Sequence, residues 1–396
     1  MRTHNIIAGG CFPKLNSKSR QTIELLCATT RKGLAGCYSK KDFFRPSLSS
    51  NDHEIRLNMA SNLRYIIMAQ IGIKRWLHFC GNDDASLPDF WEHIVSRSHE
   101  MNNAGDLGLA IWAGVESSAD DCTVFTGKLV NNWSQLRETC NAVELAWVVQ
   151  GMVRFSQCQS MTDEKTYVLR DAYDRLMDLY CQDTALFAKH SRRGFGKAIS
   201  RRVACFADQV YPILALANYG HAFRDDKGID VALAVADKLC RLQGPRGQWW
   251  WHYDVKTGTV AEEYPVFSVH QDAMAPMALL AVDKTAGTNH SAYLEKGLMW
   301  LNKRNELNAT MLMLEQGIIW RDIHRREIGK MYRIARDALI TVGWYSAHRL
   351  AGTNLFGYGV NRECRPYHLG WILYAWAGHL QKPNALPDNA LSNIGQ

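Results

Sequence analysis

Several segments of this sequence repeat one form, in which a polar residue at a helix start is followed by small and apolar residues at helical spacing. A helix that is apolar nearly all round must be buried on every side. A chain that repeats such helices therefore has to surround them with further helices. The segments begin at Gly105 (GDLGLAIWAG), Asn141 (NAVELAWVVQ), Phe206 (FADQVYPILAL), Val269 (VHQDAMAPMALLAV) and Arg365 (RPYHLGWILYAWAG).

Amphipathic segments lie between the apolar ones, for example at residues 231–242 and 291–301. The alternation predicts an all-α fold, an α/α toroid of about twelve helices in two layers around a central cavity. The starts of the inner helices should then gather at one end. A helical solenoid is the alternative, but it predicts more uniform repeats and fewer all-apolar helices. Only the stretch after Pro245 suggests short strands or loops.

The beginning of the chain differs in composition from the rest. It contains Gly9, Gly10, Pro13 and Pro46, which interrupt regular structure. We expect residues 1–50 to form an N-terminal extension that is partly helical, near residues 19–30. Residues 51–396 should then form the toroid, as a single catalytic domain.

Charge and cysteine content narrow the classes of function. A formal net charge of +7 over 396 residues is a mild bias, so we expect no nucleic-acid partner. The 11 cysteines include no CxxC pair and are best explained as reduced thiols. With no signal-peptide core and no membrane span in the pattern, we expect a cytoplasmic protein, and a peripheral contact with a membrane stays open. The basic stretch at residues 191–202 is either a solvated loop or a lip that steers anions.

One short motif suggests a family. Gln243, Gly247 and Trp249 follow a predicted outer helix with the spacing Gln, three residues, Gly, one residue, Trp. This pattern resembles the QW repeat of the squalene–hopene cyclase and protein prenyltransferase superfamily. A degraded second copy begins at Lys296. The chain looks most like the single-domain class II-type meroterpenoid cyclases, and the resemblance implies an α/α toroid.

The resemblance leaves the chemistry of that superfamily incomplete. The Asp-x-Asp-Asp acid motif of its class II cyclases is absent from the sequence. Asp120 and Cys122 have the local spacing of the prenyltransferase zinc ligands, but such a pair is common by chance. We therefore expect no metal and no cofactor.

Ionisable residues at the helix starts are the candidate catalytic groups. Each could instead be a cap that stabilises its helix by about 1 kcal/mol. A carboxyl group in an apolar cavity could also stay protonated and act as a general acid, and an adjacent imidazole could set its protonation state. Glu144, beside Trp147, is better explained as structural. The candidate catalytic residues are Asp106, Asp272, His270 and Asp208.

Aromatic and basic residues near these starts are candidates for substrate binding. Aromatic faces stabilise cations and also stack on sugar rings, so they do not choose between the two kinds of substrate. An arginine can hold a carboxylate or phosphate through two hydrogen bonds. The candidate binding residues are Trp249, Trp250, Tyr253, Phe267, Tyr211, Arg365 and His368.

Our first hypothesis is a class II-type terpenoid cyclase. Asp106, or secondarily Asp272, would protonate the alkene of an isoprenoid or prenylated acid, and the aromatic wall would stabilise the carbocation. The alternative is a carbohydrate-active toroid: a glycoside hydrolase, a uronate lyase or an epimerase acting on a glycan. A non-catalytic scaffold would leave Asp106, Asp208 and His270 as satisfied caps. A closed apolar cavity would favour the isoprenoid, and an open groove with carboxylates would favour the glycan.

Overall fold

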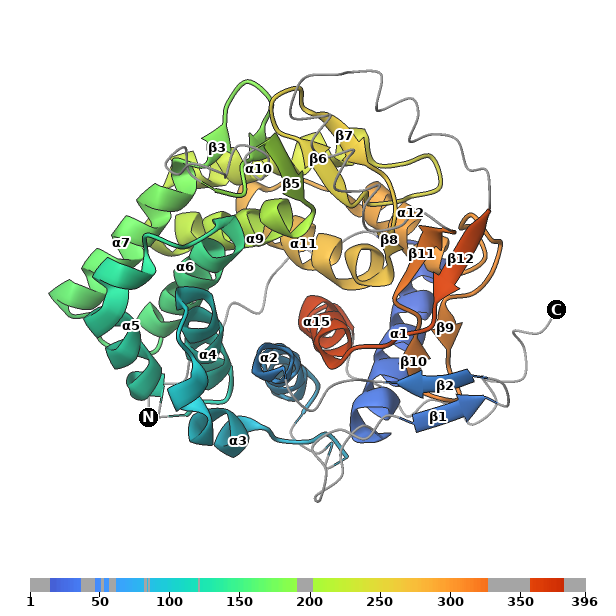
Figure 1. Ribbon diagram of the computed structural model, residues 1–396, viewed down its shortest axis with the longest axis horizontal. Coiled ribbons are helices and arrows are strands. Elements are labelled where there is room, and N and C mark those ends of the chain that lie inside the picture. The colour runs from blue at the N-terminus through green and yellow to red at the C-terminus, as the bar shows by residue number, and fades with distance from the viewer. Residues whose placement is uncertain are drawn as a thin grey trace.

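Six helices stand side by side in a closed inner ring (Figure 1). The computed structural model describes residues 15–36, 47–50, 53–56, 62–81, 84, 86–119, 122–190, 202–326 and 357–380. Within that part of the chain, each inner helix contacts the next, and α15 returns to α2 to close the ring. The inner helices are α2 (Leu63–Cys80), α4 (Ala104–Glu116), α6 (Ala142–Ser156), α9 (Ala207–Phe223), α11 (Ala275–Ala286) and α15 (Pro366–Trp376).

An outer layer covers this ring. Its helices pack on the outside of the inner ring; α10, for example, covers α9 and α11. The outer helices are α1 (Ser17–Gly36), α3 (Trp91–Ser96), α5 (Cys122–Leu136), α7 (Asp163–Met177), α10 (Asp226–Leu242) and α12 (Ser291–Leu301). Twelve α-helices therefore lie in the described residues, which confirms the predicted all-α toroid. The helix expected near residues 19–30 is α1, and it packs against α12 and α15.

Short antiparallel strands and turns connect the helices. Three strands form in the stretch after Pro245, where the sequence suggested extended chain: β6 (His252–Asp254), β7 (Thr259–Glu262) and β8 (Val266–Phe267). β6 pairs with β7 and with β5 (Val203–Cys205), and β8 joins β11 (Asp322–Arg325) and β12 (Tyr358–Asn361). The remaining pairs are β1 (Ser47–Ser50) with β2 (His53–Arg56), β3 (Tyr180–Cys181) with β4 (Leu186–Phe187), and β9 (Leu312–Met313) with β10 (Ile318–Ile319). Short turns η1 (Ser98–Glu100) and η2 (His270–Met274) complete the elements, and η2 leads directly into α11.

The motif at Gln243 forms a junction in the outer layer. The amide of Gln243, which caps α10, donates to the carbonyl oxygens of Gly247 at 3.1 Å and Tyr293 at 2.9 Å. Gly247 has φ +95°, and a Cβ there would lie 2.1 Å from the carbonyl oxygen of Lys296. Only glycine is compatible with both constraints. The motif therefore ties one outer helix to the next.

Glycines let the inner helices approach each other to backbone contact. A Cβ on Gly72 of α2 would lie 1.8 Å from the carbonyl oxygen of Gly370 on α15, and one on Gly151 of α6 would lie 2.2 Å from that of Gly108 on α4. An added methyl group would force these helix pairs apart. The diameter of the ring thus depends on residues without side chains.

Gly72→Ala should lower the free energy of unfolding by about 2–4 kcal/mol, because the new methyl group has no room between α2 and α15. Gly127→Ala is the matched control, since nothing lies within 4 Å of a Cβ at that position in α5. That change should be neutral or stabilise by about 0.5–1 kcal/mol. Urea denaturation measures both values, and equal losses would contradict the close approach.

A clamped histidine joins α10, α11 and α12. His290 Nδ1 lies 2.5 Å from Asp283 Oδ1, and its Nε2 lies 3.0 Å from Asp237 Oδ1. Burial alone would lower the pKa of His290, but the hydrogen bonds to Asp283 and Asp237 outweigh burial and raise it. The charged imidazole is therefore favoured in the folded state.

A raised pKa in the folded state stabilises the protein fully below the unfolded pKa of about 6.5, and this stabilisation is lost as the pH rises through the folded pKa. His290→Gln should therefore cost more stability at pH 5.5 than at pH 9. Melting temperatures of the wild type and the variant at both values measure the difference. A loss that does not change with pH would show that the clamp is not charged.

Candidate functional site

The first turns of the inner helices meet in a closed circle of contacts. These contacts show that the inner helices run parallel and begin at the same end, which we call the mouth. The residues of α2, α4, α6, α9, η2 and α15 that touch around the mouth are, in order, Arg64 with Asp106 and Trp147, Trp147 with Tyr211, Phe206 with His270, Asp272 with His368, and Arg365 with Tyr65.

A charged pair occupies one side of the mouth. Arg64 Nε donates to Asp106 Oδ1 at 2.6 Å, and the amide of Asn103 donates to the other carboxylate oxygen. Asn103 also caps α4 by accepting from the backbone N–H of Asp106. These donors stabilise the ionised carboxylate. Asp106 is therefore more than a cap: Arg64 and Asn103 fix its carboxyl group at the mouth, with 19 % of the side chain accessible.

An open cavity of about 300 Å³ lies beside this pair. Its lining is mostly polar, and it is formed by the starts of α2 and α4 and by the segment before α4. The lining residues are Asn62, Leu63, Arg64, Glu100, Met101 and Asp106. A cavity of this kind suits a polar ligand better than a hydrocarbon.

Aromatic rings continue the wall from Arg64. The guanidinium of Arg64 lies 5.2 Å from the ring of Trp147, and the rings of Trp147 and Tyr211 are 5.2 Å apart. The indole N–H of Trp371, on α15, donates to the hydroxyl of Tyr211 at 2.9 Å. Burial raises the pKa of Tyr211, so the hydroxyl stays protonated. The predicted residue Tyr211 therefore lies in the mouth, together with Trp147.

Asp272 and His368 form a buried pair. His368 Nε2 lies 2.8 Å from Asp272 Oδ1 and 2.9 Å from Oδ2. Burial raises the pKa of Asp272, and the adjacent His368 opposes this effect. The pair brings together two predicted residues from η2 and α15, and it can hold one proton between them.

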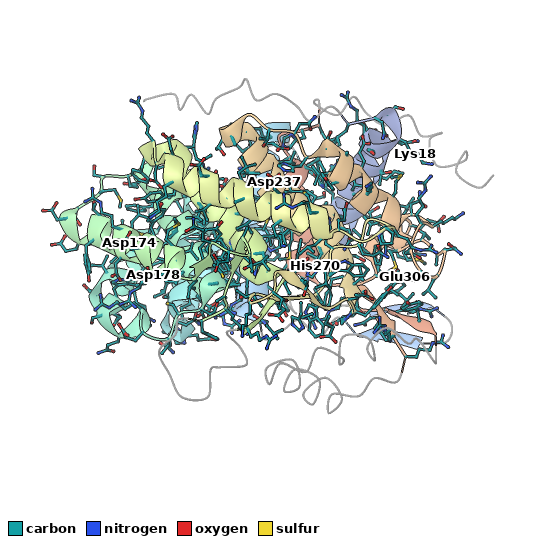
Figure 2. All side chains as sticks on the ribbon, turned by 90° about the horizontal axis from the view of Figure 1, so that it is seen from above. Lys18, Asp174, Asp178, Asp237, His270 and Glu306 are labelled. Carbon is teal, nitrogen blue, oxygen red and sulfur yellow. The ribbon has the colours of Figure 1, made fainter. Side chains whose placement is uncertain are left out.

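His270 lies beside this pair and is neutral. Burial lowers the pKa of His270 to about 3; a hydrogen bond to the backbone of Trp249 opposes this shift, and the charges of His368 and His252 add to it. The ring lies 4.5 Å from that of Phe206 and 5.1 Å from that of Phe267, which places Phe267 in the mouth as well. Figure 2 shows His270 in the lower half of the molecule, away from Asp237.

Three buried polar atoms at the mouth have no hydrogen-bond partner within the described residues: Trp147 Nε1, Asp208 Oδ1 and His270 Nδ1. They belong to α6, α9 and η2, which are neighbours in the ring. The other oxygen of Asp208 accepts from the backbone N–H of Cys205 at 2.8 Å. Leaving a buried polar atom unpaired costs about 1–3 kcal/mol, so the three atoms call for a ligand or water.

A second charged group lies where α15 begins. Arg365 makes two hydrogen bonds with the carboxylate of Glu363, which also pairs with Arg321 at 2.5 Å. Nη1 of Arg365 donates to the hydroxyl of Tyr65 at 2.7 Å. Arg365 therefore already has a structural partner, and the ring of Tyr65 packs at a tilt against that of Tyr367, with centroids 4.7 Å apart.

The three consecutive tryptophans separate. Trp249 is buried behind Phe206, and its backbone N–H donates to the side chain of Gln271. Trp250 packs against Tyr264 on the outer side, and Trp251 is half-buried and stacks on His252. Tyr253 is buried in the three-stranded sheet. Among the described residues, the ring contacts of Trp250 and the burial of Tyr253 place neither side chain at the mouth.

The sequence analysis missed Arg64 and Tyr65. Their helix α2 has the same apolar character as the other inner helices, but no acidic residue marks its start. The basic stretch at residues 191–201 and Asp120 lie outside the described residues, so the anion-steering lip and the zinc pair are not placed. Arg202, at the end of that stretch, pairs with Asp254 at 3.0 Å.

No group of three or more potential metal ligands occurs in the part of the chain that the structure describes. In the same part, no helix combines the length and the apolar character needed to cross a membrane.

Comparisons with known proteins agree with the fold. No protein-family model matches the sequence, and no curated protein matches it either. A sugar epimerase from a ruminal bacterium has a TM-score of 0.58 at 10 % identity, covering 91 % of this chain and 98 % of its own. A possible GH105 family member from Salmonella enterica has a TM-score of 0.56 at 10 % identity, covering 91 % and 94 %. An unsaturated glucuronyl hydrolase from Streptococcus agalactiae has a TM-score of 0.54 at 11 % identity, covering 92 % of each chain.

These similarities support an α/α toroid and correct the first hypothesis. The prediction of a terpenoid cyclase is wrong: the structures with this fold are named as glucuronyl hydrolases and a sugar epimerase. The squalene–hopene resemblance at Gln243 reflects an outer-layer junction and does not indicate a relationship. Asp106 also carries an arginine partner, which suits an ionised group better than the proposed alkene-protonating acid.

His270 should remain neutral between pH 5 and pH 8, because burial lowers its pKa to about 3. In ¹⁵N-histidine NMR spectra, its ring resonances should not move over this range. The spectrum of His270→Gln assigns the resonances by their disappearance. A His270 signal that titrates near pH 6.5 would show that the ring is hydrated instead of buried.

Proposed function

We propose that this chain is a carbohydrate-active enzyme that binds a sugar at the mouth and hydrolyses a glycosidic bond there. The observation that carries the proposal is the group of three unpartnered buried atoms, Trp147 Nε1, Asp208 Oδ1 and His270 Nδ1. They lie on neighbouring helices and comprise the donor Trp147 Nε1, the acceptor His270 Nδ1, and Asp208 Oδ1, which accepts when the carboxyl is ionised and donates when it is protonated. Sugar hydroxyl groups both donate and accept, so one sugar ring could satisfy all three.

The surroundings of these atoms also suit a sugar. Trp147 and Tyr211 offer aromatic faces next to polar groups, and such faces pack against the C–H side of a sugar ring. Arg64 adds a positive charge that would attract a substrate with an acidic group. The cavity beside Arg64 is open and polar, as expected for a glycan.

Two carboxylates supply the groups that glycosidic hydrolysis requires. One group must give a proton to the leaving oxygen, and the other must assist the attacking water. Asp106 accepts a hydrogen bond from the guanidinium of Arg64, so we assign it to the water. Asp208 has one oxygen fixed by the N–H of Cys205 and the other open, so we assign it to the leaving oxygen.

Epimerisation of a sugar is the second candidate function, and His270 favours it. Its ring is neutral, and the unpartnered Nδ1 carries a lone pair that could remove a proton from a carbon next to a carbonyl. The structural similarity to a sugar epimerase is consistent with this chemistry but shows only the fold.

Activity should be detectable with a panel of nitrophenyl glycosides and unsaturated glucuronyl disaccharides assayed in D₂O. Asp106→Asn and Asp208→Asn should each lower kcat by about 100-fold or more, because each removes a proton-transfer group. Release of a reducing end indicates hydrolysis. Deuterium incorporation into an uncleaved sugar, lost in His270→Gln, would indicate epimerisation instead.

Asp174→Asn is the matched control. Asp174 is exposed on outer helix α7, and Figure 2 shows it near the edge of the molecule. This variant should keep wild-type kcat. If no sugar in the panel is turned over or raises the melting temperature, the proposed function is wrong.

A further inference from the structure

The end of the ring opposite the mouth carries a cluster of basic residues that the proposed function does not use. Arg75 lies near the end of α2, Arg154 in the last turn of α6 and Lys284 in the last turn of α11. We call Arg75, Arg154 and Lys284 the basic cluster. In Figure 2, His270, which lies at the mouth, is in the lower half of the molecule, and Asp237 and Lys18 are in the upper half.

Contacts around Tyr374 of α15 hold the cluster together. The guanidinium of Arg75 lies 4.4 Å from the ring of Tyr374, and its Nε donates to the Tyr374 carbonyl oxygen at 3.0 Å. Trp112 packs against Tyr374 at 5.0 Å and donates to Glu116 at 3.2 Å. Glu116 in turn pairs with Arg154 at 3.1 Å, so both arginines are fixed beside Tyr374.

Lys284 adds a third positive charge, and the nearby His379 is neutral. Partial desolvation and the charges of Arg75 and Arg154 lower the pKa of Lys284. Burial and the charges of Arg75 and Lys284 lower the pKa of His379 to about 4. Neither shift has a contribution from a carboxylate. Within the described residues, Glu116 is the one acidic group paired with the three cations of the cluster.

The cluster also contains buried donors that lack acceptors. Gln150, 1 % exposed, precedes Arg154 by one helical turn; its oxygen accepts from Asn218, while its Nε2 has no partner in the described residues. Arg154 Nε is buried without a partner there as well. These two N–H groups are on the same side of α6 because they are four residues apart.

Helix dipoles explain only part of this arrangement. Cations near helix C-termini are stabilised by the exposed carbonyl groups, as Arg75 shows with Tyr374. That effect accounts for basic residues in the last turns. It does not account for the buried N–H groups of Gln150 and Arg154 that have no acceptor in the described residues.

We propose that the basic cluster is a binding site for a small tetrahedral oxyanion, a phosphate or sulfate group, on the opposite end of the ring from the sugar site. The anion would accept from Arg154 Nε and Gln150 Nε2 and lie between the charges of Arg75 and Lys284. It would link the C-terminal ends of α2, α6 and α11 and so stabilise the ring at the end opposite the mouth. The site is independent of the proposed sugar chemistry.

Isothermal titration calorimetry of the full chain with inorganic phosphate tests the site, at constant ionic strength set with sodium chloride. We expect one saturable site and a rise in melting temperature. Lys284→Gln should weaken binding at least about fivefold, because it removes one charge at an exposed position that needs no refolding of the core. Glu116→Gln should strengthen binding, because it removes the one opposing carboxylate.

Lys18→Gln is the matched control, since it removes the same charge from the exposed surface of α1 outside the cluster. It should leave the affinity within about twofold of wild type. A titration with glycerol phosphate separates the sources, because tight binding of the ester but not of inorganic phosphate would assign a phosphorylated metabolite. No saturable binding of either compound, or equal weakening by Lys18→Gln and Lys284→Gln, would overturn the proposal.

Discussion

The close approach of α2 and α15 is the contact on which the rest of the structure depends. These helices come from opposite ends of the described chain, and their backbones meet at Gly72 and Gly370. Closure brings Tyr65 to Arg365 and places Trp371, the residue after Gly370, against Trp112 and Tyr211. A larger separation would open the ring at this seam and remove the wall of the mouth.

Closure with parallel inner helices gives the ring two unlike ends. The helix N-termini carry partial positive charge at the mouth, and the C-termini carry partial negative charge at the other end. Asp106 and Asp208 therefore lie at the favourable end for acids, and Arg154 and Lys284 at the favourable end for bases. An acidic residue is favoured at a helix N-terminus whether it caps the helix or takes part in catalysis. The sequence alone therefore could not distinguish capping residues from functional residues.

The architecture could be predicted from the sequence, because burial imposes a pattern on each helix separately. Five of the six inner helices follow the repeated form; α2, which starts with Asn62 and Arg64, was not recognised as one of them. The geometry of the mouth could not be predicted in the same way. Arg64 meets Asp106 and Trp147 only after three different helices have been placed around the ring. Such pairings depend on the closure of the ring and leave no local pattern.

The motif at Gln243 shows why a correct fold prediction led to wrong chemistry. Its amide and glycine solve a problem of the outer layer, where the end of α10 must pack closely against α12. Any two-layer helical ring faces this problem, whatever reaction it hosts. Arg64, Asp106 and Glu100 make the cavity at the mouth polar, unlike a cavity that holds a hydrocarbon. A carbocation intermediate needs a wall without nucleophiles or water, whereas a sugar needs hydrogen-bonding partners for each hydroxyl. The unpaired atoms of Trp147, Asp208 and His270 can form such hydrogen bonds. Without a ligand or water they would lower the stability of the fold.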